Sequence, residues 1–232
     1  NPAPIGNDDA ASTDEDAAVS GNVLGNGGAG DVADTDPDGD ALSVTTFTIA
    51  GDPTTHNAGD SVTIANIGTF TLGSDGAYTF TPEDNWNGTV PTVTYTVDDG
   101  EGGSDTAELV VTVTPVNDAP VTEGTIGEQN SVDAQSITPL DITSYFSDVD
   151  TGDTLSYSAL GLPQGLTIDP ATGIITGTID NSASQDGNGG VHSVTVTATD
   201  GSGASVAQTF SWTVTNPAPT GNDDAATTHA EA

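Results

Sequence analysis

The chain has 232 residues, of which 35 are Asp or Glu and none is Lys or Arg, so its formal net charge is −35. Without cationic side chains it cannot attract the phosphates of nucleic acid or the surface of an anionic membrane, and we expect neither as a partner. The absence of Cys also excludes disulfides, thiolate nucleophiles and cysteine-ligated metals.

Short runs in which Val, Ile, Tyr or Phe alternate with Thr or Ser occur along the whole chain and predict strands. The clearest runs lie at 42–49, 77–81, 92–97, 109–114 and 194–199. Clusters of Asp, Gly and Ser separate the runs at the 8 to 12 residue spacing of a β-sandwich. We find no amphipathic helix of useful length and no apolar run of about 18 residues that would span a membrane. The sequence therefore predicts an all-β protein made of two β-sandwiches in tandem.

Two internal repeats divide the chain. Residues 93–114 align with 194–215 without a gap, so we expect both domains to end in the same hairpin. Residues 1–11 and 216–226 are identical at ten of eleven positions, which predicts one period of a longer repetitive polypeptide. Short Pro-containing linkers join the parts. The expected parts are a first domain at 1–117, a second domain at 118–217 and the start of the next repeat at 218–232.

The acidic residues concentrate at the ends of predicted strands and in the linkers. Two carboxylates about 5 Å apart repel each other by roughly 3 kcal/mol at an effective dielectric constant near 20, and no cationic side chain offsets this cost. Ca²⁺ accepts six to eight oxygen ligands in irregular geometry, whereas Mg²⁺ needs stricter geometry and transition metals prefer imidazole or thiolate. We therefore expect several Ca²⁺ ions, concentrated where the domains join.

Two segments carry the same acidic device, DTDPDGD at 34–40 and DVDTGD at 148–153. The first matches the opening half of an EF-hand loop, but Thr45 stands at the twelfth position and no helices flank it, so an EF-hand is excluded. Asp-x-Asp still places two carboxylates within reach of one ion, and the Gly allows the backbone to turn. After a one-residue gap, Asp36, Asp38 and Asp40 align with Asp148, Asp150 and Asp153.

The segment FSDVDTGDTLSYSALGLPQGLTIDPATGIITGTI at 146–179, followed by VTVTATDGSG, resembles the dystroglycan-type, cadherin-like or Ig-like repeats of bacterial surface proteins. Residues 5–120, with DPDGDALSV, YTFTPEDNWNGT and PVNDAP, resemble tandem-95 or VCBS-type cadherin-like repeats. Such repeats occur in large RTX adhesins exported by type I secretion. The resemblance implies a location outside the bacterial cell, at its surface, and neighbouring repeats of the same polypeptide as partners.

The resemblance also implies which residues bind calcium. The first-strand acid of cadherins corresponds to Glu15 and Glu128, and the Asp of their A-x-D-x-G turn to Asp99 and Asp200. Their acidic linker is reduced to Asn117 and Asp118, and their mid-domain Asp-Arg-Glu segment has no equivalent, so one or two ions per junction are implied rather than three. The expected ligands form three groups: Asp8 and Asp9 with Asp36, Asp38, Asp40 and Asp99; Glu15, Asn117 and Asp118 with Asp148, Asp150 and Asp200; and Asp223 and Asp224 with Glu128. Asp153, which aligns with Asp40, is a further expected ligand.

These expectations favour a monomeric, non-enzymatic spacer, stiffened by calcium, that holds the ligand-binding tip of a long adhesin away from the cell. Catalysis by paired carboxylates is disfavoured because aromatic residues make up only 5% of the chain and cationic orienting groups are missing. The alternative is a calcium-dependent carbohydrate- or peptide-binding module that uses the loop 181–190 or the surroundings of Trp86.

Overall fold

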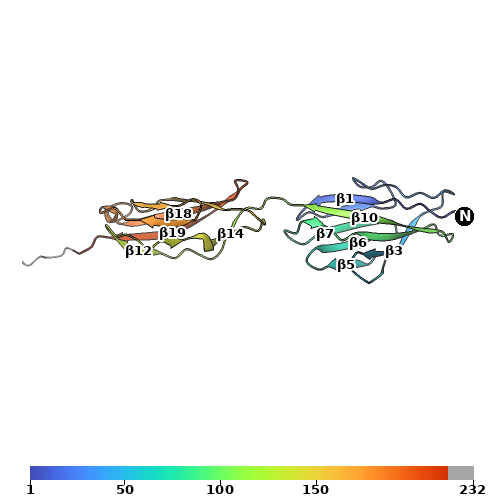
Figure 1. The fold of residues 1–232 in the computed structure, drawn as a ribbon, viewed down its shortest axis with the longest axis horizontal. Helices are drawn as coiled ribbons and strands as arrows, with labels where there is room; N and C mark the ends of the chain where they lie inside the picture. The colour runs from blue at the N-terminus through green and yellow to red at the C-terminus, as the bar shows by residue number, and fades with distance from the viewer. Residues whose placement is uncertain (219–232) are drawn as a thin grey trace, which may run out of the picture. The chain divides into compact units, whose positions relative to one another are not determined.

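A computed structural model describes residues 1–218 of the chain, which form two compact units, Asn1–Val116 and a second that begins at Asn117. The predicted all-β class is confirmed, because the described residues form nineteen strands and two single-turn 3-10 helices (Figure 1). No helix within these residues is long and apolar enough to span a bilayer.

Unit 1 consists of two sheets that pack face to face. The first sheet has the strand order β1-β10-β9-β3-β4, with β8 also paired to β10, and the second has the order β2-β7-β6-β5. β1 runs parallel to β10, and the other pairs are antiparallel. The strands of unit 1 are β1 (Asp9–Asp14), β2 (Val19–Asn22), β3 (Ser43–Ile49), β4 (His56–Asn57), β5 (Ser61–Ile64), β6 (Gly68–Leu72), β7 (Ala77–Pro82), β8 (Gly88–Thr89), β9 (Val93–Asp98) and β10 (Ser104–Thr114).

The core of unit 1 follows from the two-residue period of its strands. Alternate residues of β9, including Tyr95, are buried, while the Thr residues between them face outward. Phe47 of the first sheet meets Phe70 of the second edge-on, with ring centroids 5.6 Å apart, and Phe80 is also fully buried. Each such side chain contributes roughly 1.5–3 kcal/mol on burial. The Val and Thr alternation in the sequence therefore specifies both faces of the sheets.

Unit 2 has a main sheet with the order β12-β19-β18-β15, a three-stranded sheet β13-β17-β16 and the short pair β11-β14. β12 runs parallel to β19, and the remaining pairs are antiparallel. Its elements are β11 (Val121–Thr122), β12 (Gln129–Val132), β13 (Leu140–Asp141), η1 (Thr143–Tyr145), β14 (Phe146–Ser147), β15 (Ser156–Leu160), β16 (Leu166–Ile168), β17 (Ile174–Gly177), η2 (Ala183–Gln185), β18 (Val191–Thr199) and β19 (Ser205–Thr215).

The core of unit 2 is built around Ile142, Ile175 and Trp212, all buried. The Trp212 indole satisfies its N–H by donating to the Ser131 hydroxyl of β12 at 3.1 Å, so the side chain both fills the core and joins two strands. Trp212 is thus a core residue of this unit.

Both units end in the same hairpin, as the internal repeat predicts. In unit 1 the hairpin is formed by β9 and β10, and its turn is closed by the Asp99 amide donating to the Gly103 carbonyl at 3.2 Å. In unit 2 it is formed by β18 and β19, and the Asp200 amide donates to the Ala204 carbonyl at 3.0 Å. Each turn thereby places a buried aspartate at the same position of its unit.

Candidate metal sites

Three carboxylates of unit 2 come together at one place. One carboxylate oxygen from each of Asp148, Asp153 and Asp200 lies within 4.8 Å of the other two. Asp148 and Asp153 follow β14, and Asp200 follows β18, so the fold brings together acids that are about fifty residues apart in the sequence. Because the chain has no Lys or Arg, no side chain of its own can neutralise this group.

Asp148 has an oxygen available for a ligand. Its Oδ1 accepts the Asp150 amide two residues later at 2.9 Å, a local turn that orients the carboxylate. Its Oδ2 is buried and has no hydrogen-bond partner among the described residues. A buried polar atom left without a partner costs roughly 1–3 kcal/mol, and more when it is charged. A cation at this oxygen would remove that cost.

Asp200 is held in the ionised form by the turn that surrounds it. Its Oδ1 accepts the amides of Ser202, Gly203 and Ala204 at 2.9, 2.6 and 2.8 Å. Its Oδ2 accepts the side-chain amide of Asn117 at 2.9 Å. The Asn117 hydrogen bond, followed by the backbone amides, outweighs burial and lowers the pKa of Asp200 below its ordinary value. A carboxylate that stays ionised is a suitable ligand for a divalent cation.

The first residues of unit 2 form hydrogen bonds with the acids around this candidate site. The Asn117 side-chain amide, besides meeting Asp200, donates to the Asp118 carbonyl at 2.8 Å. The Asp118 amide donates to Oδ2 of Asp150 at 2.8 Å. Four expected ligands of this unit, Asn117, Asp118, Asp150 and Asp200, are therefore joined by direct hydrogen bonds at the entry of the chain into the domain.

Unit 1 repeats the first part of this arrangement. Asp36 Oδ1 accepts the amides of Asp38 and Asp40 at 2.7 and 3.2 Å, and Asp36 Oδ2 is buried with no hydrogen-bond partner among the described residues. Gly39 (φ +83°) and Gly152 (φ +102°) occupy the left-handed region in the two acidic segments, as expected of glycines that let the backbone turn. Asp36 is thus the counterpart of Asp148.

Unit 1 repeats the second part as well. Asp99 Oδ1 accepts the amides of Glu101 and Gly103 at 2.8 and 2.9 Å, and its Oδ2 accepts the side-chain amide of Asn1 at 2.8 Å. Burial raises the pKa of Asp99, but these hydrogen bonds outweigh it and the pKa lies below its ordinary value. A Cβ at Gly103 would collide with the Asp99 carboxylate, so this close approach requires glycine. No group of three acids as compact as that of unit 2 occurs among residues 1–116.

In each unit, a buried acid directly follows the strand that runs parallel to the last strand. In unit 1 this acid is the expected Glu15, but in unit 2 it is not the expected Glu128. In unit 1, Glu15 follows β1, is 5% exposed, and accepts the Val116 amide at 2.6 Å and the Asn87 side-chain amide at 2.9 Å. In unit 2, the expected counterpart Glu128 instead precedes β12 and is exposed.

Asp133 occupies the position in unit 2 that Glu15 occupies in unit 1. The Asp133 amide donates to the Thr215 carbonyl at 3.1 Å, as the Glu15 amide donates to Thr114 at 2.9 Å. Asp133 is 6% exposed and accepts both the amide and the hydroxyl of Ser184, at 2.9 and 2.6 Å. The sequence does not single out Asp133, because its position after a parallel strand is not visible without the strand register.

Asp8 and Asp9 do not join Asp36 as expected. Asp8 is exposed and accepts the Glu108 amide at 2.9 Å. Asp9 is 3% exposed, accepting the Val32 amide at 2.7 Å and the Tyr95 hydroxyl at 3.0 Å.

Burial raises the pKa of Asp9 to about 6, although its hydrogen bonds work in the opposite direction. Its side chain therefore belongs to the interior of unit 1. The expected ligands Asp223 and Asp224 lie outside the described residues.

The donor set is one that a hard cation such as calcium accepts. The groups that remain available are carboxylate oxygens, with neither thiolate nor imidazole among them. Hard oxygen ligands in an irregular, loop-built arrangement are typical of Ca²⁺ sites. The buried oxygens of Asp36 and Asp148, each without a donor, agree with such an ion.

The two places that sequence suggested for a ligand-binding module have other contacts. Trp86 is half-buried and packs edge-on against Phe80, with ring centroids 6.4 Å apart, so it extends the core of unit 1. In the loop 181–190, Ser184 is bound to Asp133 and the His192 ring lies 3.1 Å from the Ala183 carbonyl oxygen.

Comparison with known proteins defines the class of both units. Residues 1–115 match the family model described as "Bacterial cadherin-like domain", and residues 119–215 match that described as "Putative Ig domain". The chain therefore consists of a cadherin-like domain and an Ig-like domain in tandem, domain types that are found in adhesion proteins. No curated protein sequence matches the chain.

Solved cadherin structures share the fold. Domains EC1-4 of Drosophila N-cadherin superpose with a TM-score of 0.59 at 17% identity, over 92% of this chain and 50% of that one. Human mucin-like protocadherin EC1-2 gives 0.56 at 14% identity, over 94% of this chain and 100% of that one. Mouse cadherin-23 EC22-24 superposes with a TM-score of 0.53 at 17% identity, over 94% of this chain and 65% of that one. The chain spans about half of the N-cadherin fragment, and identities this low establish the fold alone.

Proposed function

We propose that the chain is a calcium-stabilised, non-enzymatic spacer of a long repetitive adhesin that acts outside the bacterial cell, with Ca²⁺ and neighbouring repeats of the same polypeptide as its partners. The observation that carries the proposal is the pair of buried carboxylate oxygens on Asp36 and Asp148, each without a donor and each at the corresponding place of its unit. A spacer needs the same ion-binding arrangement in every repeat, whereas a site that recognises a ligand is needed only once.

The residues that would hold the ions are the carboxylates that meet at these places. In unit 2 they are Asp148, Asp153 and Asp200, oriented by Asn117 and by the turn amides. In unit 1 they are Asp36 and Asp99, oriented by the Asp38 and Asn1 amides. A bound Ca²⁺ supplies the positive charge that the chain lacks.

The ions would stiffen the chain because residues of the linker are hydrogen-bonded to acids of unit 2 at the candidate ion site. Asn117 and Asp118 follow directly after unit 1 in the chain and are hydrogen-bonded to acids of unit 2. Holding those acids together without a cation costs Coulomb repulsion, which favours conformations in which the linker moves away. Glu15 and Asp133, buried at the ends of their units, are the further acids that we assign to this function.

Small-angle X-ray scattering of the 232-residue chain tests the proposal. We expect a narrower distribution of interatomic distances in millimolar Ca²⁺ than in chelator. The double variant Asp36→Asn, Asp148→Asn should show the chelator profile under both conditions, while Asp169→Asn, an exposed turn aspartate, should behave like the wild type. Identical wild-type profiles with Ca²⁺ and with chelator would contradict the spacer function.

A further inference from the structure

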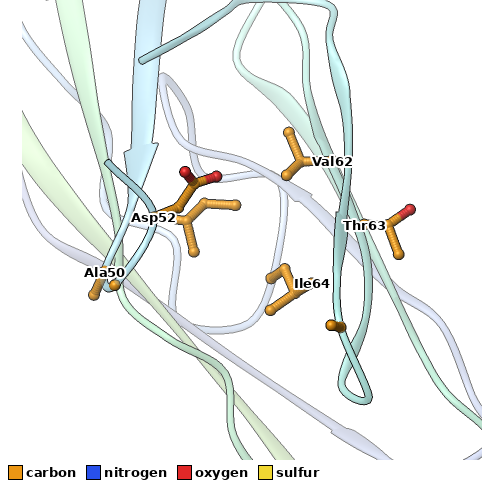
Figure 2. Close-up of a pocket in the computed structure, with 8 residues that line it drawn as sticks. Ala50, Asp52, Val62, Thr63 and Ile64 are labelled. Carbon is orange, nitrogen blue, oxygen red and sulfur yellow. The ribbon is translucent and has the colours of Figure 1, made fainter. Parts of the chain in front are cut away.

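A second site lies on unit 1, away from the acids described above. A pocket of about 260 Å³ opens between the end of β3 and the strand β5, lined by residues 49–52 and 62–65. Figure 2 shows the side chains of Val62 and Ile64 on the pocket side of β5, with Asp52 across from them and Thr63 pointing to the opposite side. The pocket is thus a groove of mixed lining, with the apolar side chains of Val62 and Ile64 on one side and the carboxylate of Asp52 at its rim.

One wall of the groove is an open strand edge. β5 is the last strand of its sheet and pairs only with β6, so the backbone N–H and C=O groups on its other side have no neighbouring strand among the described residues. Proteins commonly protect such edges with Lys, Pro or inward-facing charges. The β5 sequence Ser-Val-Thr-Ile has none of these. Its outer edge is therefore able to pair with another extended chain.

The size of the groove selects the kind of ligand. Pockets for small molecules usually enclose about 300–1,000 Å³, and this one is smaller. Val62 and Ile64 are half-buried and pack against the core of unit 1, so a further apolar side chain in the groove would extend that core. A strand that adds to a sheet edge offers side chains alternately to the groove and to solvent.

The charge of the chain selects the partner. Every ionised side chain of this protein is acidic apart from the three His, and the formal net charge is −35, so a second copy would be repelled at long range whereas a cationic chain would be attracted. At the rim, Asp52 accepts the Thr54 amide at 2.9 Å and lies 3.0 Å from the His56 ring. The Thr54 amide, followed by other hydrogen bonds, lowers the pKa of Asp52, so its carboxylate is ionised at neutral pH.

We propose that the edge of β5 binds an extended segment of a cationic partner protein by strand addition, with an apolar side chain of that segment in the groove and a Lys or Arg beside Asp52. This interaction uses none of the acids of the candidate metal sites and does not depend on the spacer function.

Titration of the isotopically labelled full chain with synthetic peptides, followed by NMR, tests the inference. The probe is a seven-residue peptide in which Val and Thr alternate between two terminal Lys residues. We expect saturable binding that shifts the amide resonances of Ser61–Ile64, and at least about tenfold weaker binding to the variant Val62→Asn, as for a pocket that loses its apolar contact. The matched control Thr79→Asn makes the same kind of change on the exposed face of β7, outside the lining of the groove, and should bind within about twofold of the wild type, because surface positions away from a contact tolerate substitution.

Two control peptides test the inference on the wild-type chain and therefore do not depend on whether Val62→Asn folds. A peptide with every backbone amide methylated cannot donate to a strand edge and should not bind. A peptide with Glu in place of both Lys should bind at least about tenfold more weakly, with the difference shrinking as salt is added. The inference is overturned if the lysine peptide does not bind, if the methylated peptide binds equally well, or if Val62→Asn leaves the affinity unchanged. It is also overturned if sedimentation shows that β5 pairs with a second copy of the chain.

Discussion

Asp36 and Asp148, 112 residues apart in the sequence, have the same local environment: Oδ1 of each accepts the amide two residues later, and Oδ2 of each is buried without a donor. Two domains of different family carry the same unsatisfied carboxylate oxygen at corresponding places. An ordinary solvated aspartate would not need to be buried, so the repetition points to a common ligand.

Replacing Asp148 by Asn should weaken calcium binding to unit 2 by at least about tenfold, because the change removes the negative charge at the oxygen that has no other partner. Calorimetric titration of Ca²⁺ into the variant measures the loss. Asp169→Asn is the matched control, since Asp169 also accepts turn amides but is exposed. Equal affinities of Asp148→Asn and the wild type would remove Asp148 from the site.

Replacing Asn117 by Ala should weaken calcium binding by about 10- to 100-fold, the range typical of residues that orient a metal ligand. The Asn117 amide is the largest cause of the lowered pKa of Asp200, so the variant should also raise that pKa. NMR titration of the Asp200 carboxyl carbon in chelator measures the second effect. If the affinity falls while the Asp200 pKa stays unchanged, Asn117 does not act through Asp200.

Removing calcium should lower the melting temperature of the chain markedly. An ion present at one hundred times its dissociation constant stabilises the folded state by about 2.7 kcal/mol per site. For domains of about 100 residues, 1 kcal/mol changes the melting temperature by about 4–8 °C, so chelation should lower it by more than about 10 °C. Differential scanning calorimetry measures this shift, and a change of only one or two degrees would argue against structural ions.

Unit 1 should lose stability in chelator as the pH rises from about 4 to about 6. Burial raises the pKa of Asp9 from 3.8 to about 6, so in this range the folded state binds more protons than the unfolded state, and the free energy of unfolding falls with rising pH. The pKa difference corresponds to at most about 3 kcal/mol. Asp105, whose pKa is lowered by the Gly6 amide, acts in the opposite sense but only below about pH 4.

Urea unfolding at a series of pH values, followed by the NMR amide resonances of core strand β9, measures this dependence for unit 1. The variant Asp9→Asn should reduce the slope between pH 4 and 6, and the remaining slope comes from Asp34, whose pKa is also raised by burial. A wild-type unfolding free energy that rises over the same interval would contradict a buried, partly protonated Asp9.

The sequence predicts the all-β fold, and in each unit it predicts the hairpin turn and the turn of the Asp-x-Asp segment, because these features depend on local patterns. The alternation of Val with Thr predicts strands such as β9 and β18, and the match of 93–114 with 194–215 predicts that Asp99 and Asp200 occupy equivalent turns. The Asp-x-Asp segments predict the local turns of Asp36 and Asp148, since these involve residues only two apart.

The remaining features depend on pairing between distant strands, which the sequence does not express. The acid that corresponds to Glu15 is Asp133 rather than Glu128, because β12 pairs with β19 in the register Val132 with Thr215 and ends there. Asp9 was expected among metal ligands, but the parallel pairing of β1 with β10 turns its side chain into the interior, toward the Tyr95 hydroxyl. The sequence around an aspartate does not show whether its carboxylate faces water or the hydroxyl of a buried tyrosine.

Calorimetric titration of Ca²⁺ into the wild-type chain, alongside the double variant Asp36→Asn, Asp148→Asn, tests the central claim most directly. We predict saturable binding to the wild type with dissociation constants of about 10⁻⁴ to 10⁻³ M, as in other extracellular modules, and loss of that binding in the double variant. Absence of binding to the wild type at millimolar Ca²⁺, or an unchanged isotherm for the double variant, would contradict it.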